Sequence, residues 1–216
     1  MSPSLFEDFR PSKEELAPGA VVLHEFLSEE QSRQLVALIG EIATVSPFRH
    51  MAVRGGRRMS VAMTSCGALG WISDESGYRY SRLDPLTGKP WPEMPPEFLE
   101  LASRAASEAA FTKFLPDACL INRYTPGAQM GLHQDRDEKD AGAPIVSVSL
   151  GLPATFLFGG SRRSERPHRI PLQSGDVVVF GGPSRLAYHG IGKLASGEHP
   201  LSGRSRLNLT FRKTGF

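Results

Sequence analysis

Cysteine is scarce in this sequence: Cys66 and Cys119 are its only two among 216 residues. They stand alone rather than in a C-x-x-C pair, so neither a disulfide framework nor a zinc site made of thiolates is indicated. No hydrophobic run approaches the ~18 residues of a membrane-spanning helix. Residues 1–16 also lack the apolar stretch of a secretory signal. We therefore expect a cytoplasmic protein with no membrane partner.

An excess of one charge is also missing. The formal net charge is +2, from 25 Lys and Arg against 23 Asp and Glu. This balance excludes a uniformly basic surface but allows a local basic patch. The length suits one domain with a substantial core. We predict a single domain over residues 1–216, in which residues 1–18 form an N-terminal arm that is ordered only if it packs on something.

Two helices are predicted in the first half of the chain. Ser28 is typical of an N-cap, with Gln31 as its capping-box partner, and apolar residues then recur at helical spacing up to Ile42. A second helix is expected to begin at Pro95-Pro96 and to end near Phe111.

From residue 118 onward the pattern changes to short strands separated by turn residues, which is typical of a β-sandwich or jelly roll. We predict a mostly β protein with flanking helices, whose core at residues 118–213 is a double-stranded β-helix (jelly roll). Residues 19–117 would form an N-terminal extension that contains the helices.

His133 and Asp135 are the first candidate metal ligands. Positions i and i+2 of an extended strand point to the same face, although most such pairs are ordinary surface residues. A later histidine, His189, would complete a set of two imidazoles and one carboxylate. That set is the facial triad of non-haem Fe(II) oxygenases.

The last predicted strand, residues 206–212, alternates apolar and polar side chains. Arg206, Asn208, Thr210 and Arg212 share one face. On an ordinary surface strand they would point to water. Inside a jelly roll the two arginines would need anionic partners, because a buried unpaired charge is costly. 2-Oxoglutarate would supply carboxylates that suit arginine, and an Fe(II) site that activates O2 needs the electrons that this co-substrate provides.

Aromatic residues gather in the loop-rich segment 47–92, which holds Trp71, Tyr78, Tyr80 and Trp91. Three arginines precede them: Arg54, Arg57 and Arg58. Such aromatics often only cover a small core. Alternatively, they form a stacking platform with phosphate-binding arginines beside it, as single-stranded nucleic acid requires.

Several motifs together carry a family resemblance. They are Asn122-Arg123-Tyr124, His133-Gln134-Asp135-Arg136-Asp137, Gly175-Asp176-Val177, Tyr188-His189-Gly190 and the R-x-N-x-T-x-R pattern from Arg206 to Arg212. With these motifs the sequence resembles the AlkB family of Fe(II)/2-oxoglutarate-dependent dioxygenases, and within it the bacterial DNA-repair members. The resemblance covers roughly residues 20–212.

The resemblance implies a role for each matching position. His133, Asp135 and His189 would hold Fe(II) and act in catalysis. The 2-oxoglutarate site would comprise Asn122, Arg123, Tyr124, Arg206, Asn208, Thr210 and Arg212. The substrate base would meet Met63, Trp71, Tyr78, Arg79, Tyr80, Asp137 and Arg163, so part of residues 19–117 would be a nucleotide-recognition segment.

The implied function is oxidative demethylation of N-alkylated bases such as 1-methyladenine and 3-methylcytosine, with release of formaldehyde, succinate and CO2. The implied partner is alkylated DNA, preferably single-stranded, with the protein acting as a monomer, and RNA is a second implied partner. Two alternatives remain open at this point. One is a 2-oxoglutarate-dependent hydroxylase of a protein or small molecule, and the other is a non-catalytic nucleic-acid-binding module.

Overall fold

Two β-sheets, a β-hairpin and two helices make up the computed structural model, which describes residues 10–53 and 55–216. The larger sheet consists, in spatial order, of β1 (Lys13–Ala17), β2 (Ala20–Leu23), β12 (Val177–Phe180), β9 (Ile145–Gly151), β14 (Arg206–Arg212), β7 (Ala118–Tyr124), β4 (Arg58–Gly67) and β3 (Arg49–Ala52). The smaller sheet consists of β11 (His168–Leu172), β10 (Ala154–Phe158), β13 (His189–Ile191) and β8 (Met130–His133). The hairpin is β5 (Gly70–Asp74) with β6 (Gly77–Ser81). Every strand pair is antiparallel, so the predicted jelly roll is confirmed.

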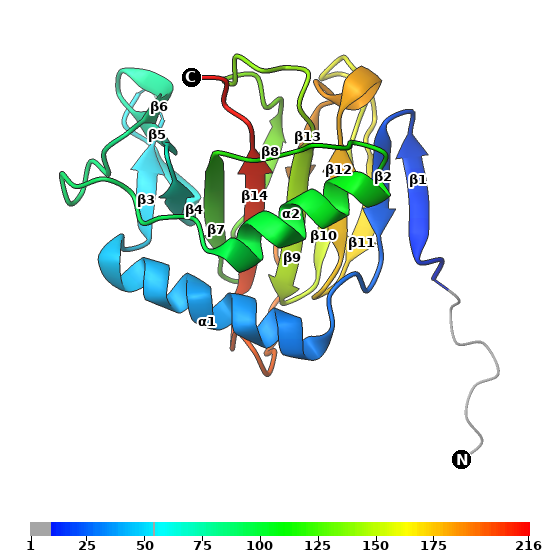
Figure 1. Cartoon of the computed structure of the whole chain (residues 1–216), viewed down its shortest axis with the longest axis horizontal. Coiled ribbons are helices and arrows are strands. Elements are labelled where there is room, and N and C mark those ends of the chain that lie inside the picture. The colour runs from blue at the N-terminus through cyan, green and yellow to red at the C-terminus, as the bar shows by residue number, and fades with distance from the viewer. Residues whose placement is uncertain (1–9, 54) are drawn as a thin grey trace.

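Helices α1 (Glu29–Val45) and α2 (Pro96–Glu108) both cover the outer face of the larger sheet (Figure 1). The capping box predicted for α1 is present: Gln31 N donates to Ser28 Oγ, and Ser28 N donates to Gln31 Oε1. These bonds satisfy amide groups that a helix N-terminus leaves without partners. Helix α2 ends at Glu108, before the Phe111 predicted as its end, because Ala110 takes a left-handed φ of 66°.

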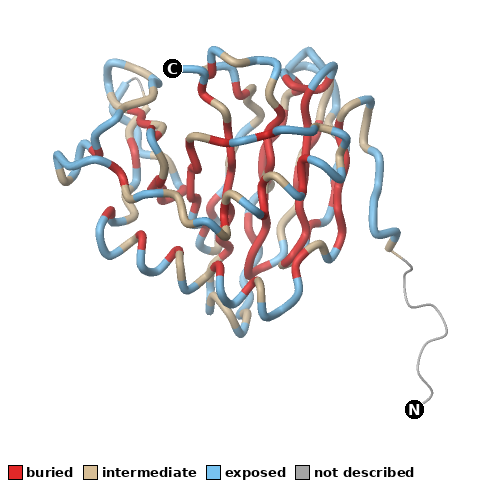
Figure 2. Tube along the Cα trace, in the orientation of Figure 1, coloured by how far each residue is buried: buried red, intermediate tan, exposed pale blue. Residues whose placement is uncertain are grey.

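The central strands of the larger sheet are buried on both faces (Figure 2). Its outer face and the helices share one apolar core, to which β14 contributes Leu207, Leu209 and Phe211. A second apolar core fills the space between the two sheets and contains Phe156 of β10 and Phe180 of β12. The polar residues of β14 therefore point into the space between the sheets, as their alternation predicts. The functional site lies in that space.

The N-terminal part of the chain extends the larger sheet at both edges. Strands β1 and β2 add to one edge, and β4 and β3 add to the other. The boundary expected between residues 117 and 118 therefore does not divide the sheet. Of the predicted arm, residues 1–9 lie outside the described residues, whereas Lys13–Ala17 is ordered by pairing with β2. Arg10 Nη2 also donates to Asp176 Oδ2 at 2.9 Å, which fixes the start of the described chain to the sheet.

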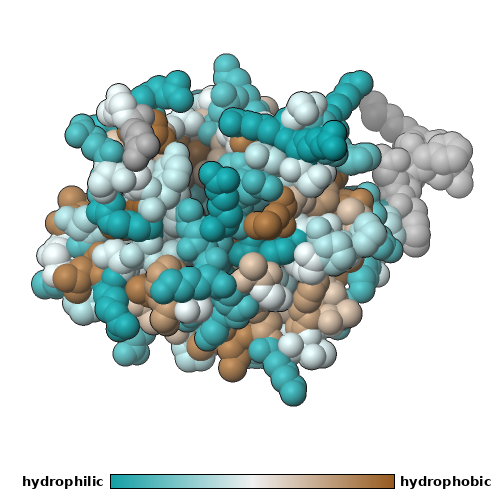
Figure 3. Space-filling model, turned by 90° about the horizontal axis from the view of Figure 1, so that it is seen from above, coloured by the Kyte–Doolittle hydropathy of each residue, from teal (hydrophilic) through white to brown (hydrophobic). Residues whose placement is uncertain are grey.

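None of the helices within residues 10–53 and 55–216 is long and apolar enough to cross a membrane. Seen from above, the surface is mostly hydrophilic, and hydrophobic side chains appear only in separate small areas (Figure 3).

Candidate active site

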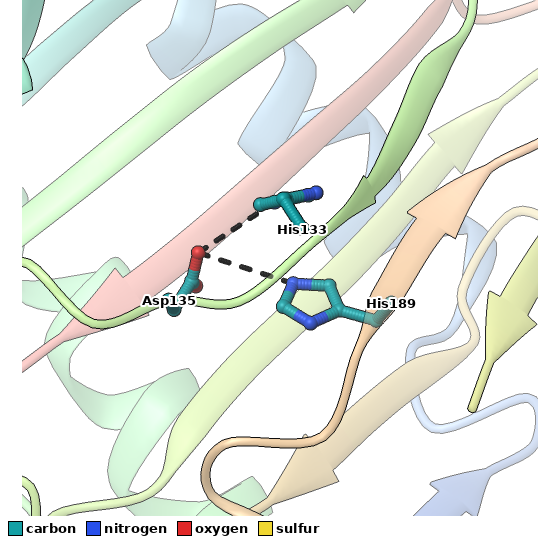
Figure 4. A group of neighbouring side chains, drawn as sticks. All are labelled: His133, Asp135 and His189. Carbon is teal, nitrogen blue, oxygen red and sulfur yellow. Dashed lines mark ion pairs between the residues drawn. The ribbon is translucent and has the colours of Figure 1, made fainter. Parts of the chain in front are cut away.

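The three predicted metal ligands converge in the space between the sheets (Figure 4). His133 ends β8 and His189 begins β13. These two strands pair with each other, and His133 and His189 are direct register partners. Asp135 Oδ1 lies 3.6 Å from His133 Nε2 and 3.9 Å from His189 Nε2. All three potential ligand atoms fall within 4.8 Å of one another. Strand pairing therefore brings together residues that are far apart in the sequence.

Both imidazoles are held with their Nε2 atoms free. His133 Nδ1 donates to the carbonyl oxygen of Gly131 and His189 Nδ1 to that of Ala187, each at 3.0 Å. Such bonds on the far nitrogen fix the ring orientation of metal-binding histidines. Burial and the neighbouring His133 lower the pKa of His189 to about 4, so this imidazole is neutral at pH 7. A neutral imidazole is the form that binds a metal.

Asp135 is held on one side by an arginine. Arg212 donates from Nε and Nη2 to Asp135 Oδ2, at 2.9 and 2.7 Å. Burial acts to raise the pKa of Asp135, but Arg212 and the two histidines outweigh it, so the pKa lies well below its ordinary value. The carboxylate is therefore ionised, with Oδ2 occupied by Arg212 and Oδ1 directed toward the imidazoles.

This donor set fits Fe(II). Two imidazoles and one carboxylate on a single face are the ligands of non-haem Fe(II) oxygenases, and they leave positions open for other ligands. The thiols of Cys66 and Cys119 are buried in the structure and are not part of the cluster.

The triad forms part of the wall of a cavity of about 430 Å³. Thirteen of the predicted site residues line it: Met63, Trp71, Tyr78, Asn122, Tyr124, His133, Asp135, Asp137, Arg163, His189, Asn208, Thr210 and Arg212. A cavity of this size is within the range of small-molecule sites. It reaches from β14 on one side to the β5–β6 hairpin on the other.

Arg206 lies behind Tyr124 and has no anionic partner within residues 10–53 and 55–216. It is 1% exposed, and its guanidinium carbon is 5.1 Å from the centre of the Tyr124 ring. Nη2 donates to Ser149 Oγ at 3.0 Å, but the buried Nη1 has no hydrogen-bond partner among the described residues. A buried arginine with an unsatisfied donor is costly unless a ligand completes it. The far carboxylate of 2-oxoglutarate fits this requirement.

The two arginines of β14 differ from each other, although both were expected to need an external anion. Arg212 already pairs with Asp135, and its Nε is also 3.3 Å from Glu138 Oε1. Arg206 has no carboxylate partner among the described residues, whereas Arg212 lines the cavity beside Asp135.

Side-chain hydrogen bonds of Asn122 and Asn208 connect β7, β14 and β9 on the face toward the cavity. Asn122 Nδ2 donates to Asn208 Oδ1, which also accepts from Thr210 Oγ1. Asn208 Nδ2 donates to the backbone oxygen of Val148. Asn122 Oδ1 is buried and has no partner among the described residues, so it too is open to a ligand in the cavity.

Besides Arg206, three predicted site residues do not line the cavity. Arg123 is exposed, with its guanidinium carbon 4.4 Å from the centre of the Phe48 ring, because it alternates with the inward-facing Asn122 and Tyr124. Arg79 is exposed and pairs with Asp74 at 2.6 Å. Tyr80 does not line the cavity, since its hydroxyl donates to Glu138 Oε1 at 2.5 Å. The structure therefore places Arg123, Arg79 and Tyr80 outside the lining of the cavity.

The opposite wall of the cavity offers aromatic and acidic groups. The rings of Trp71 and Tyr78 stack with centres 5.3 Å apart and planes at 19°. Trp71 Nε1 donates to Asp137 Oδ2 at 2.8 Å. Tyr78 is 55% exposed and marks the open side of the cavity. A flat cationic ligand would find π-faces and a carboxylate together here.

Sequence reasoning missed two buried residues beside the triad, Glu138 and Arg185. Arg185 donates to Glu138 Oε2, to the backbone oxygen of Asp135 and to that of Ala143. It therefore fastens the segment that carries Asp135 to the turn that precedes His189. Glu138 directly follows the segment from His133 to Asp137, and this position is a signal that could have made it a candidate. No sequence pattern links Glu138 to Arg185, because their contact depends on the fold of the turn that precedes His189.

The arginines predicted to bind phosphate do not gather beside the triad in the described part of the chain. Arg57 and Arg58 are exposed at the start of β4, and Arg54 lies outside the described residues. The stretch from Arg162 to Arg169 is also largely exposed, and within it Arg163 reaches the cavity.

Comparison with known proteins gives consistent matches. Residues 19–212 match the model of the 2OG-Fe(II) oxygenase superfamily. The chain is 57% identical to the alpha-ketoglutarate-dependent dioxygenase AlkB of Salmonella typhimurium, covering 97% of this chain and 96% of that protein. It is 32% identical to the DNA N(6)-methyladenine demethylase ALKBH1C of Arabidopsis thaliana, covering 92% of this chain and 49% of that protein. The solved structure of OsALKBH1 superposes with a TM-score of 0.80 at 30% identity, covering 93% of this chain and 99% of that one.

Proposed function

The chain belongs to the AlkB family within the 2OG-Fe(II) oxygenase superfamily, and from this premise we propose that it repairs N-alkylated bases in DNA by oxidative demethylation. It is a dioxygenase that depends on Fe(II), 2-oxoglutarate (alpha-ketoglutarate) and O2. The observation that carries the proposal is the single cavity that has the metal triad on one side and the Trp71–Tyr78 stack with Asp137 on the other.

The proposed co-substrate site follows the polar face of β14. Arg206 would bind the far carboxylate of 2-oxoglutarate with Nη1, beside the Tyr124 ring. Asn122 and Asn208 would line the path from there to the triad. His133, Asp135 and His189 would hold Fe(II). When bound, Fe(II) with 2-oxoglutarate and O2 supplies the oxidation that puts one oxygen atom into a C–H bond of the N-methyl group, while 2-oxoglutarate becomes succinate and CO2.

The chain's own residues would position the base for this oxidation. A base within a duplex cannot reach a buried metal, so it has to be flipped out or presented on a single strand. Trp71 would stack on the base. Asp137, held by the Trp71 indole, would face a base that methylation at N1 of adenine or N3 of cytosine has made cationic. The hydroxymethyl group formed on the ring nitrogen then breaks its N–C bond, which releases formaldehyde and the repaired base.

We also propose that the protein works as a monomer on single-stranded DNA in the cytoplasm. Tyr78 at the open side of the cavity is exposed enough to meet an unpaired base. Arg57, Arg58 and Arg163 would contact phosphates. RNA offers the same base edges, so methylated RNA is a second proposed substrate.

A substrate panel tests this proposal. Single-stranded and duplex oligonucleotides with one 1-methyladenine, a methylated RNA of the same sequence, and a methyl-lysine peptide would each be incubated with enzyme, Fe(II) and 2-oxoglutarate. We expect formaldehyde release with the nucleic acids, greatest for the single strand. Release with the peptide alone would instead identify a protein hydroxylase, and no release from any substrate would favour a non-catalytic module.

A further inference from the structure

The β5–β6 hairpin contacts the segment that follows the metal ligand Asp135, although among the described residues neither of its strands pairs with a strand of the two sheets. Trp71 and Tyr80 are register partners in this hairpin. Trp71 Nε1 donates to Asp137 Oδ2 at 2.8 Å, and the Tyr80 hydroxyl donates to Glu138 Oε1 at 2.5 Å. One rung of the hairpin therefore holds two successive carboxylates of the segment that follows Asp135.

Glu138 continues this contact toward the metal ligand. Its Oε1 atom, which accepts from Tyr80, also lies 3.3 Å from Arg212 Nε. Arg212 in turn donates from Nε and Nη2 to Asp135 Oδ2. Glu138, Arg212 and Asp135 are all buried, so these charges act in a medium of low polarity where their interactions are strong. A continuous polar chain thus runs from the hairpin to a metal ligand.

The second oxygen of Glu138 is fixed as well. Arg185 Nη2 donates to Oε2 at 3.0 Å, and Arg185 Nη1 donates to the backbone oxygen of Asp135. Glu138 therefore has little freedom to compensate if one of its partners is lost. Loss of the Tyr80 hydroxyl would leave Arg212 as the partner of Oε1 and so would alter the pairing of Arg212 with Asp135.

We propose that Tyr80 is a positioning residue that, through Glu138 and Arg212, holds Asp135 with Oδ1 directed at the two imidazoles and so couples the base-binding hairpin to metal affinity. The positioning role of Tyr80 rests on the metal site of the proposed function and not on nucleic acid being the substrate, whereas the coupling to a bound base rests on both. It gives Tyr80 a role other than lining the base pocket. Because coupling between two ligands is reciprocal, a base that moves the hairpin through Trp71 would change metal affinity by the same factor as the metal changes base affinity.

The test removes one hydroxyl group. Tyr80→Phe and Tyr78→Phe would be made in the full chain, and Mn(II) would be titrated in the presence of saturating 2-oxoglutarate, with free Mn(II) measured by electron paramagnetic resonance. Loss of a partner next to a metal ligand costs about 10- to 100-fold in metal affinity. Since Tyr80 acts through two intervening groups, we expect Tyr80→Phe to weaken Mn(II) binding about three- to tenfold.

Tyr78→Phe is the matched control, because Tyr78 lies on the same hairpin and is exposed. It should leave Mn(II) affinity within about twofold of the wild type, since no path on the structure links its hydroxyl to Asp135. Equal Mn(II) affinity in Tyr80→Phe and the wild type would overturn the proposal. So would equal weakening in the two variants, which would mean that any change in the hairpin disturbs the site.

A double-mutant cycle separates positioning from general loosening. Glu138→Gln removes the charge that pairs with Arg212 but keeps an oxygen that can accept from Tyr80. If Tyr80 acts through Glu138, then Tyr80→Phe should weaken Mn(II) binding less than twofold in the Glu138→Gln background. An undiminished effect in that background would refute the path through Glu138. Melting temperatures of all variants would show that each remains folded.

A last arm adds an oligonucleotide with one 1-methyladenine. In the wild type it should change Mn(II) affinity severalfold, and Tyr80→Phe should bring that factor close to one. If the oligonucleotide does not bind the wild type, the proposed substrate is wrong, while the Mn(II) titrations without it still decide the role of Tyr80. A factor that is the same in both proteins would contradict the coupling.

Discussion

Arg206 is a buried cation without a carboxylate partner among the described residues. Its replacement should weaken the binding of 2-oxoglutarate and leave the binding of the metal unchanged. In Arg206→Lys the ammonium retains the charge but replaces a planar fork with a point contact. In the wild type Nη2 is already bonded to Ser149, and Nη1 is the atom without a partner. A lysine cannot serve Ser149 and a carboxylate with the same geometry.

The magnitude follows from the bond that is lost. A hydrogen bond to a charged group contributes about 1.5–3 kcal/mol, so the Kd for 2-oxoglutarate should rise about 10- to 100-fold. At a concentration of 100 times the wild-type Kd, the ligand stabilises the wild type by about 2.7 kcal/mol. For a domain of this size that is a rise of about 5–10 °C in Tm. With a Kd raised about 50-fold, the same concentration gives about 0.6 kcal/mol, or only about 1–3 °C.

The assay is thermal unfolding with saturating Mn(II), with and without 2-oxoglutarate. Arg212→Lys is the matched control, because it makes the same change on the same strand beside Asp135. It should weaken Mn(II) binding, while Arg206→Lys should leave Mn(II) binding without 2-oxoglutarate unchanged. If 2-oxoglutarate raised the Tm of Arg206→Lys as much as that of the wild type, Arg206 would be a structural residue and the assigned carboxylate site would be wrong.

The remaining predictions concern the metal, the base, the phosphates and the fold. Alanine at any triad position should abolish Fe(II)-dependent formaldehyde release without unfolding the protein, as circular dichroism would show; full release in all three would refute the triad. Asp137→Asn should lose most activity on the cationic 1-methyladenine and 3-methylcytosine and less on 1-methylguanine and 3-methylthymine; an equal loss on all four would assign Asp137 to support of the metal. Arg57→Gln and Arg163→Gln should each flatten the plot of log affinity against log salt for single-stranded DNA by about 0.7 if the residue contacts one phosphate, and an unchanged slope would remove that residue from the interface. Burial acts to raise the pKa of Asp84, but hydrogen bonds from Arg49 and Ser46 outweigh it and lower the pKa. Asp84→Asn should therefore destabilise the protein at pH 7 by about 2 kcal/mol, and denaturant unfolding should show this difference shrinking as the pH falls below about 4; a difference independent of pH would contradict the pairing.

Local patterns predicted the elements whose side chains follow a strict period. The alternation of β14 placed its polar residues on the inner face, and the capping box placed the start of α1. The same rule explains the outward position of Arg123. Its neighbours Asn122 and Tyr124 share the inward face, so alternation already placed Arg123 outside, but it was assigned to the site as part of a matching run.

Contacts between distant segments could not be read from the sequence. The family resemblance implies a place for Tyr80 in the base pocket, whereas its hydroxyl donates to Glu138, a contact that depends on how the hairpin packs. Arg185 binds the segment after His133 only because the turn that follows β12 folds over it. Lys13–Ala17 likewise forms a strand because it pairs with the edge of β2. The polar sequence of this segment alone does not predict that pairing.

The central claim is that the protein removes a methyl group from a nucleic-acid base by oxidation, and that this reaction takes place in the cavity beside the metal triad. The most direct measurement is the mass of a single-stranded oligonucleotide with one 1-methyladenine after incubation with enzyme, Fe(II), O2 and 2-oxoglutarate, together with the formaldehyde and succinate formed. We predict loss of the methyl group, with about one formaldehyde and one succinate for each base repaired, and no change with Asp135→Ala. An oligonucleotide that keeps its methyl group while the wild-type enzyme forms succinate would contradict the account.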